Sequence, residues 1–314
     1  MRIVSLLSSA TEILFGIGAG HDVVAISHEC DYPPEAIDRP RATRSIVDSS
    51  QPSAQIDQQV KRLLEAGEPL YEIDRELIQR LAPDLIVTQA QCDVCAVRYQ
   101  DVVDFVAGEP VLAKTKILAL NPQYLMQIFE DVLRVGEAAG RWEAATVFKN
   151  RLLRRHAEVV KKAGNPWMKT ELRPRVVVIE WTEPLMAAGN WTPELIQVAG
   201  GDLLLAETGK HSGYVTWLDI VAARPEVLIV APCGFNLERS TAEARRLVGL
   251  PGYRELPAVA MGRAYVVDGN AYLNRSGPRI VDSLEILAHF IRPDRFEPPA
   301  GELAEGRAWT RLVA

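Results

Sequence analysis

The stretch LIQRLAPDLIVTQAQC, residues 77–92, decides the fold of this chain. It predicts a helix, a turn at Pro83-Asp84, a strand buried on both faces, and a cysteine at the end of that strand. The stretch WLDIVAARPEVLIVAPC, residues 217–233, repeats this order of features. A weak internal duplication is the simplest explanation, and it puts Cys92 and Cys233 at matching positions in two halves of the chain.

Further apolar runs of strand length occur in both halves, separated by segments long enough for a helix. The runs are RIVSLL, DVVAIS, DLIVTQ and KILAL in the first half, and RVVVIEW, DLLLA, EVLIVA and AYVVD in the second. This pattern is typical of parallel strands joined by crossover helices, so the predicted fold class is α/β. We expect an α/β lobe over residues 1–121, a helical connecting segment over 122–164, and a second α/β lobe over 165–314.

Two local features refine this prediction. Residues Trp142 to Ala163 show no strand signal and predict one continuous helix. Gly200 and Gly201 are expected to end the helix of TPELIQV, because glycine tolerates the left-handed conformation common at helix ends.

The overall charge excludes several kinds of partner. The 314 residues carry a formal net charge of -6, and the sequence pI is about 5.5. Nucleic acid and anionic membranes are not attracted to an acidic surface, so neither is expected as a partner. The basic run RLLRRHAEVVKK, residues 151–162, has helical spacing and is interpreted as the solvated face of a helix.

The opening MRIVSLLSSATEILFGIGAG is interrupted by the polar run SSATE and lacks a small-residue cleavage site. It therefore predicts a strand and a helix rather than an export signal. No run approaches the roughly 18 uninterrupted apolar residues of a membrane span. The predicted location is the cytoplasm, or the periplasm if the chain is a processed form.

All four cysteines follow an apolar, strand-like run: Cys30, Cys92, Cys95 and Cys233. In an open α/β sheet, ligands bind at the carboxyl ends of the strands, so these thiols predict a thiol-rich pocket. Cys92 and Cys95 have CxxC spacing at a predicted helix start, which favours the thiolate form. Metal ligation, thiol exchange, a disulfide and inert packing all stay open for them.

Other candidate residues lie at the same strand ends. His28-Glu29-Cys30-Asp31 follows the second strand, either as a simple hydrogen-bonded loop or as part of a site. In the second half, the aromatic residues Trp181, Trp191, Phe235 and Tyr272 offer flat walls for a large planar ligand, and Asn270 and Arg275 offer polar anchoring. Packing in the core is the alternative for each tryptophan, and a surface salt bridge is the alternative for the arginine.

The chain contains no GxGxxG after its first strand, no GxxxxGK[ST] and no GxSxG motif. It therefore shows neither a phosphate-binding loop nor a nucleophile elbow. Of the enzyme constellations, only a Cys/His nucleophile pair involving His28 stays open, and its spacing does not select it. The leading hypothesis is a binding protein without catalytic turnover.

Several motifs give the chain a family resemblance over roughly residues 2–292. They are SHECDYP (27–33), TQAQCDVCA (88–96), EWTEP (180–184), PCGF (232–235) and GPR (277–279). With them the chain resembles the cobalamin and iron-chelate substrate-binding proteins of ABC importers, and most of all the cobalamin-binding branch. The resemblance implies two Rossmann-like α/β lobes joined by a single long helix, with the ligand in the cleft between them. It implies cobalamin, another corrinoid or a related metal chelate as ligand, and an ABC importer as partner.

The predicted ligand-binding residues share a place at strand ends or in the motifs above: His28, Glu29, Gln89, Glu180, Trp181, Trp191, Phe235, Asn270, Tyr272 and Arg275. The predicted metal ligands are imidazole and thiol groups: His28, Cys30, Cys92, Cys95 and Cys233. The alternative hypothesis is a metalloprotein or thiol-redox enzyme that binds zinc or an iron–sulfur centre through the same cysteines.

Overall fold

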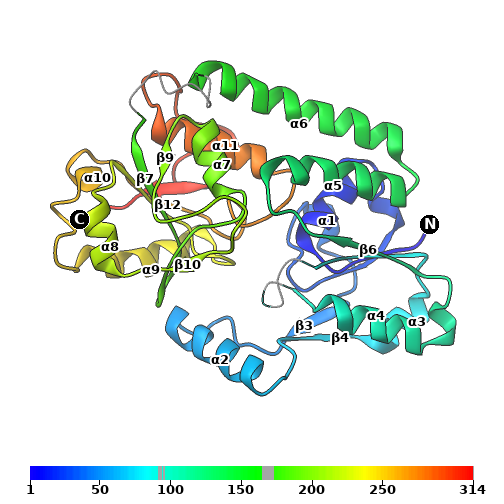
Figure 1. The fold of residues 1–314 in the computed structure, drawn as a ribbon. Coiled ribbons are helices and arrows are strands. Elements are labelled where there is room, and N and C mark those ends of the chain that lie inside the picture. Colours follow the sequence, from blue (N-terminus) through cyan, green and yellow to red (C-terminus); the bar gives the residue numbers. More distant parts are fainter. Residues whose placement is uncertain (91–93, 95, 165–172, 314) are drawn as a thin grey trace. The chain divides into compact units, whose positions relative to one another are not determined.

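The computed structural model describes residues 1–90, 94, 96–164 and 173–313 (Figure 1). The chain divides into two compact units. The first comprises Met1–Pro122 and Met126–Leu152, and the second comprises Gln123–Leu125 and Leu153–Ala314. Both units have an α/β architecture, which confirms the fold class predicted from the sequence.

The first unit is built on a parallel sheet in the order β2-β1-β5-β6. The strands are β1 (Ile3–Ser5), β2 (Val23–Ile26), β5 (Leu85–Gln89) and β6 (Lys116–Leu120). Each lies within an apolar run that predicted a strand. Every residue of β1 and β5 is buried, as expected for strands covered on both faces.

Helices and a small ribbon complete the first unit. Its α-helices are α1 (Ser8–Gly16), α2 (Ser53–Glu65), α3 (Arg75–Leu81), α4 (Tyr99–Gly108) and most of α5 (Leu125–Ala138), and its short 3-10 helices are η1 (Gly20–Asp22), η2 (Pro34–Ala36) and η3 (Pro110–Leu112). The antiparallel ribbon pairs β3 (Thr43–Ser45) with β4 (Tyr71–Ile73). The sequence did not predict the ribbon, because TRS and YEI mix polar and apolar residues and lie outside the apolar runs that predict the other strands of this unit.

The second unit contains a mixed sheet in the order β10-β8-β7-β11-β12-β13, with β9 beside β7. Its strands are β7 (Arg175–Thr182), β8 (Leu185–Ala187), β9 (Asp202–Leu203), β10 (Gly213–Tyr214), β11 (Val227–Val230), β12 (Ala264–Val267) and β13 (Trp309–Arg311). The parallel strands β7, β11 and β12 were predicted. The antiparallel strands β8, β10 and β13 were not.

The helices of the second unit are α7 (Thr192–Val198), α8 (Trp217–Ala223), α9 (Leu237–Val248), α10 (Pro257–Ala260), α11 (Ile280–Ile291) and the 3-10 helix η4 (Gly301–Leu303). Gly200 ends α7 as predicted. It has a φ of 93° and donates its N–H to the carbonyl of Gln197, while Gly201 donates to Ile196. This is the hydrogen-bond pattern of a helix closed by a left-handed glycine.

Helix α6 (Trp142–Ala163) is one continuous helix with the predicted ends (Figure 1). Its residues up to Leu152 belong to the first unit, and those from Leu153 onward belong to the second. Within the described part of the chain, none of the helices combines the length and apolar character needed to traverse a bilayer.

The predicted duplication extends to backbone detail. Helices α3 and α8 both end at a left-handed residue before a proline, Ala82 with a φ of 39° and Arg224 with a φ of 48°. The acidic residue after each proline then bonds a residue at the start of a neighbouring strand: Arg2, which directly precedes β1, and Arg175, the first residue of β7.

In the first unit, Asp84 Oδ2 accepts from the Arg2 N–H at 2.7 Å, and the Asp84 N–H donates to the Arg2 carbonyl at 2.8 Å. In the second, Glu226 Oε2 accepts from the Arg175 N–H at 3.0 Å, and the Glu226 N–H donates to the Arg175 carbonyl at 2.8 Å. These two-bond links, here called the strand-start links, support an internal repeat.

Candidate functional site

In the second unit, the loops after three parallel strands meet at the carboxyl edge of the sheet. The Cys233 N–H after β11 donates to the Glu180 carbonyl in β7 at 3.0 Å. The Asn270 N–H after β12 donates to the Phe235 carbonyl at 3.0 Å. The Trp181 and Phe235 rings lie 5.1 Å apart between centroids. The structure therefore brings together most of the residues that the sequence singled out in this half.

The loops after β11 and β12 approach each other more closely than most side chains would permit. A Cβ atom on Gly269 would lie 2.1 Å from the Pro232 carbonyl oxygen, so only glycine fits there. The Asn274 side-chain amide donates to the carbonyls of Ala231 and Gly269, both at 2.9 Å. The loops after β11 and β12 are therefore closely packed and held together by hydrogen bonds.

A polar pair stands on this edge. Arg275 is only 9% exposed, and its guanidinium donates to Asn270 Oδ1 at 2.7 Å. The neighbouring Asp268 accepts the N–H groups of Asn270 and Ala271. Burial raises the pKa of the Asp268 carboxyl, although these N–H groups and the charge of Arg275 oppose the shift.

The aromatic residues of this edge differ in exposure. Trp181 is partly exposed, and its indole N–H donates to the Glu183 carbonyl at 3.0 Å. Phe235 is 3% exposed, with the Arg239 guanidinium carbon 3.6 Å from its ring centroid. Burial raises the pKa of Tyr272 to about 12, which keeps its hydroxyl protonated.

The interpretation of Trp191 as a ligand wall needs correction. Its side chain is 5% exposed, and its indole N–H donates to the Leu273 carbonyl at 2.8 Å. The ring is part of the interior of the second unit, so it offers no free face to a ligand. The core-packing alternative therefore applies to this tryptophan.

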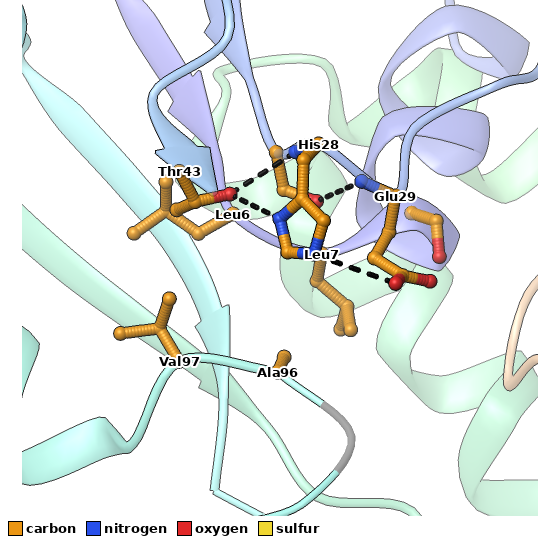
Figure 2. Close-up of a pocket in the computed structure, with 9 residues that line it drawn as sticks. Leu6, Leu7, His28, Glu29, Thr43, Ala96 and Val97 are labelled. Carbon is orange, nitrogen blue, oxygen red and sulfur yellow. Dashed lines mark hydrogen bonds and ion pairs between the residues drawn. The ribbon is translucent and has the colours of Figure 1, made fainter. Parts of the chain in front are cut away.

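The first unit has a small pocket at its own carboxyl edge (Figure 2). Its lining comes from the ends of β1 and β2, from β3, and from the segment after β5: Leu6, Leu7, Ser8, Ser27, His28, Glu29, Thr43, Ala96 and Val97. Its volume, measured to the centres of water-sized molecules, is about 10 Å³. That is room for about one water, so the pocket by itself is far too small for a corrinoid.

His28 lies between Thr43 and Glu29 (Figure 2). Thr43 Oγ1 accepts a hydrogen bond from the His28 backbone N–H at 3.0 Å. The same oxygen lies 2.8 Å from the His28 ring nitrogen Nδ1. His28 Nε2 is buried and 3.4 Å from the Glu29 carboxylate, and no hydrogen-bond partner for it occurs among the described residues. If Nδ1 carries the proton, Nε2 presents a lone pair that suits a metal or a donor group.

Cys30 does not join this pocket. It is fully buried, and its Sγ lies 3.1 Å from Thr11 Oγ1 and 3.6 Å from Ser27 Oγ. The prediction that Cys30 faces a ligand is therefore wrong in this structure, because the thiol points into a buried polar cluster. Cys233 is partly exposed, at the edge of the second unit.

The other candidate residues of the first unit lie in or after β5. Gln89 ends β5 and is 4% exposed. Cys92 and Cys95 lie outside the described residues, so their assignment as metal ligands stays a prediction. Among residues 1–90, 94, 96–164 and 173–313, no three histidine, cysteine, aspartate or glutamate side chains form a group that could hold a metal ion.

Sequence reasoning missed several residues that shape these edges. Thr43 orients His28 but belongs to a three-residue strand that carries no sequence signal. Tyr71 packs 5.2 Å from the His28 ring and donates its hydroxyl to the Val94 carbonyl. The sequence could have indicated the turn at Asp268, because Asp-Gly-Asn after an apolar run is typical of a turn.

Comparison with known proteins identifies the family. Residues 3–271 match the periplasmic binding protein family. An uncharacterized ABC transporter substrate-binding lipoprotein of Bacillus subtilis is 24% identical over 301 residues, covering 94% of this chain and 81% of that protein. A vitamin B12-binding protein of Vibrio parahaemolyticus is 24% identical over 295 residues, covering 92% and 89%.

A solved structure shows the same fold. The periplasmic heme-binding protein of Pseudomonas aeruginosa superposes with a TM-score of 0.70 at 18% identity, over 100% of this chain and 98% of that one. The family match spans most of the chain, and the α/β units described above agree with it. The chain therefore belongs to the periplasmic binding protein family.

Proposed function

We propose that this chain is the substrate-binding protein of an ABC importer and binds a corrinoid such as cobalamin, or a related metal chelate, without chemical turnover. The observation that carries the proposal is the convergence of Trp181, Asn270 and Arg275 at the carboxyl edge of the second unit. Family membership and the vitamin B12-binding relative support the same ligand class.

The proposed roles follow from exposure and chemistry. Trp181 is the partly exposed indole of this edge and packs against a face of the macrocycle. Arg275 is already oriented by Asn270, so it donates to carbonyl groups at the macrocycle periphery with little loss of side-chain freedom. Phe235 is buried and supports the Trp181 ring from within the unit, and Tyr272, which is 8% exposed, stays a candidate contact.

Within the first unit, taken by itself, His28 and Glu29 stay candidate ligand contacts. Thr43 holds the His28 ring in one orientation, and the imidazole has the chemistry of a metal ligand, although its Nε2 is buried in this structure. The partly exposed Glu29 carboxylate accepts hydrogen bonds from amide groups of a ligand.

The proposed place of action is outside the cytoplasm, beside an importer in the cell envelope. The Bacillus subtilis relative is by name a lipoprotein, and the superposed heme-binding protein is by name periplasmic. Neither supports the cytoplasmic location expected from the sequence. Fractionation of cells that express the native gene tests this location.

Titration tests the ligand class. Purified protein is titrated with cyanocobalamin and, separately, with hemin, following visible absorbance and calorimetric heat. We expect cyanocobalamin to bind with a Kd in the micromolar range or below and to be recovered unchanged. Absence of heat and of spectral change for both chelates at roughly 100 µM, where even weak binding is seen, overturns the proposal.

A variant pair localises the site. Trp181→Ala should weaken binding about tenfold, since it removes an aromatic contact and its buried area. Trp142→Ala is the matched control, because Trp142 is a 52% exposed tryptophan in α6. Equal affinities for the two variants would remove Trp181 from the site.

A further inference from the structure

We infer that Trp191 is a positioning residue for ligand binding, and that it acts by fixing the segment Asp268–Arg275, here called the arginine loop. The inference rests on the proposed function, since it concerns how Asn270 and Arg275 are held ready for the chelate. Trp191 itself touches no ligand, because its ring is enclosed in the second unit.

The link is a single buried hydrogen bond. The indole N–H of Trp191, at the start of α7, donates to the Leu273 carbonyl at 2.8 Å. Leu273 is 2% exposed, and Trp191 is 5% exposed. A buried carbonyl that loses its donor is costly, so this bond constrains the loop more than an exposed bond would.

Leu273 needs such a constraint. Its φ is 67°, in the left-handed region that leucine seldom occupies. Its N–H donates to Ser283 Oγ in α11 at 2.9 Å. The backbone of this one residue is therefore held from two sides, by Trp191 through the carbonyl and by Ser283 through the N–H.

Contacts on both sides of Leu273 hold the rest of the arginine loop. Asp268 accepts the N–H groups of Asn270 and Ala271, and Asn274 donates to the carbonyls of Ala231 and Gly269. Those contacts anchor the loop to β11 and to itself. The Trp191 indole N–H ties Leu273 to the start of α7.

Loss of the Trp191 donor leaves the Leu273 carbonyl buried and unsatisfied in the native conformation. Loop conformers that turn this carbonyl to water are then favoured, and the Asn270–Arg275 pair is formed in a smaller fraction of molecules. The apparent Kd rises as the competent fraction falls, although no contact with the ligand has been removed.

The test compares two tryptophans with the same chemistry. Trp191→Phe keeps an aromatic ring and removes the N–H donor. Trp309→Phe is the matched control, because Trp309 is 1% exposed in the same unit and its indole N–H also donates to a backbone carbonyl, that of Leu303, at 3.0 Å. We expect about tenfold weaker cyanocobalamin binding for Trp191→Phe, and a change within about twofold for Trp309→Phe.

Two further readouts separate positioning from general destabilisation. Hydrogen exchange of the amides between Gly269 and Arg275 should accelerate in Trp191→Phe and not in Trp309→Phe. In a double-mutant cycle, Trp191→Phe should cost far less affinity in an Arg275→Ala background, because both changes act through the same loop. If Trp191→Phe does not fold, Ser283→Ala removes the other anchor of Leu273 and should show the same exchange and affinity changes.

The outcomes are distinguishable. Wild-type affinity in Trp191→Phe, or full additivity with Arg275→Ala, overturns the positioning role. A wild-type protein that binds no chelate overturns the proposed function instead. In that case the exchange comparison, which needs no ligand, still decides whether Trp191 holds the arginine loop.

Discussion

Replacing Gly269 with alanine tests whether the carboxyl edge of the second unit is as tightly built as its geometry indicates. The added Cβ would lie 2.1 Å from the Pro232 oxygen, 2.7 Å from the Pro232 carbonyl carbon and 2.8 Å from the Ala231 carbonyl carbon. All three are backbone atoms, so no flexible side chain can turn away. The loops after β11 and β12 must move apart.

The expected cost follows from this contact. Overpacking a well-filled region destabilises a protein by typically about 1–3 kcal/mol, and a clash with backbone belongs at the upper end. We therefore expect Gly269→Ala to lower the free energy of unfolding of the second unit by about 3 kcal/mol. Movement of the loop also displaces Asn270, so the affinity for the chelate should fall in the same variant.

Gly249→Ala provides the matched control. Gly249 follows α9 with a φ of -84°, and a Cβ there meets no atom within 4 Å. Neither glycine has a positive φ, so the two variants differ in packing alone. The control should match wild type or be slightly more stable, because alanine has less conformational freedom in the unfolded chain.

The assay is urea unfolding followed by circular dichroism and tryptophan fluorescence, with each transition fitted separately, since a chain of two units need not unfold in one step. The reasoning is refuted if Gly269→Ala and Gly249→Ala unfold at the same urea concentration with the same slope.

Two further predictions concern the first unit and the internal repeat. Burial raises the pKa of Asp131 to about 6 from an ordinary 3.8, against the opposing charge of Arg134, so stability conferred by the protonated group is complete below pH 4 and is lost as the pH rises through 6. Asp131→Asn should match wild type at pH 3.5 and exceed it at pH 8 by on the order of 2 kcal/mol in urea unfolding; an unchanged pH profile contradicts this. Ala82→Gly and Arg224→Gly should each raise stability by up to about 1 kcal/mol, because glycine relieves a left-handed residue, whereas Ala223→Gly at the end of α8 should lower it by about 0.5–1 kcal/mol. Equal thermal shifts in all three variants would speak against the backbone argument.

The long elements could be predicted from the sequence because their signals are local. The apolar runs at Leu85–Gln89 and Val227–Val230 became buried parallel strands, and Trp142–Ala163 became a helix with the expected ends. Strands β3, β8, β10 and β13 have two or three residues and, unlike the equally short β1, lie outside the apolar runs that predicted strands. Their place depends on neighbours that are distant in sequence.

The candidate site was predictable as a set of strand ends, but not residue by residue. Parallel topology puts Trp181, Phe235 and Asn270 at one edge, and the sequence contains that topology. Whether a ring faces outward depends on partners such as Leu273, which lies 82 positions beyond Trp191. Likewise, Cys30 follows a strand as its neighbours do, yet its thiol turns toward Thr11.

The strand-start links hold neighbouring strands together at the amino-terminal edge of each sheet, opposite the edge that carries the candidate ligand-binding residues. Arg2–Asp84 and Arg175–Glu226 each fasten the amino-terminal edge through one backbone–backbone bond and one bond to the carboxylate of the acidic residue. The candidate ligand-binding residues lie at the other edge, so substitutions among them leave both links untouched. The contacts that hold neighbouring strands together are therefore separate from the residues proposed to contact a ligand.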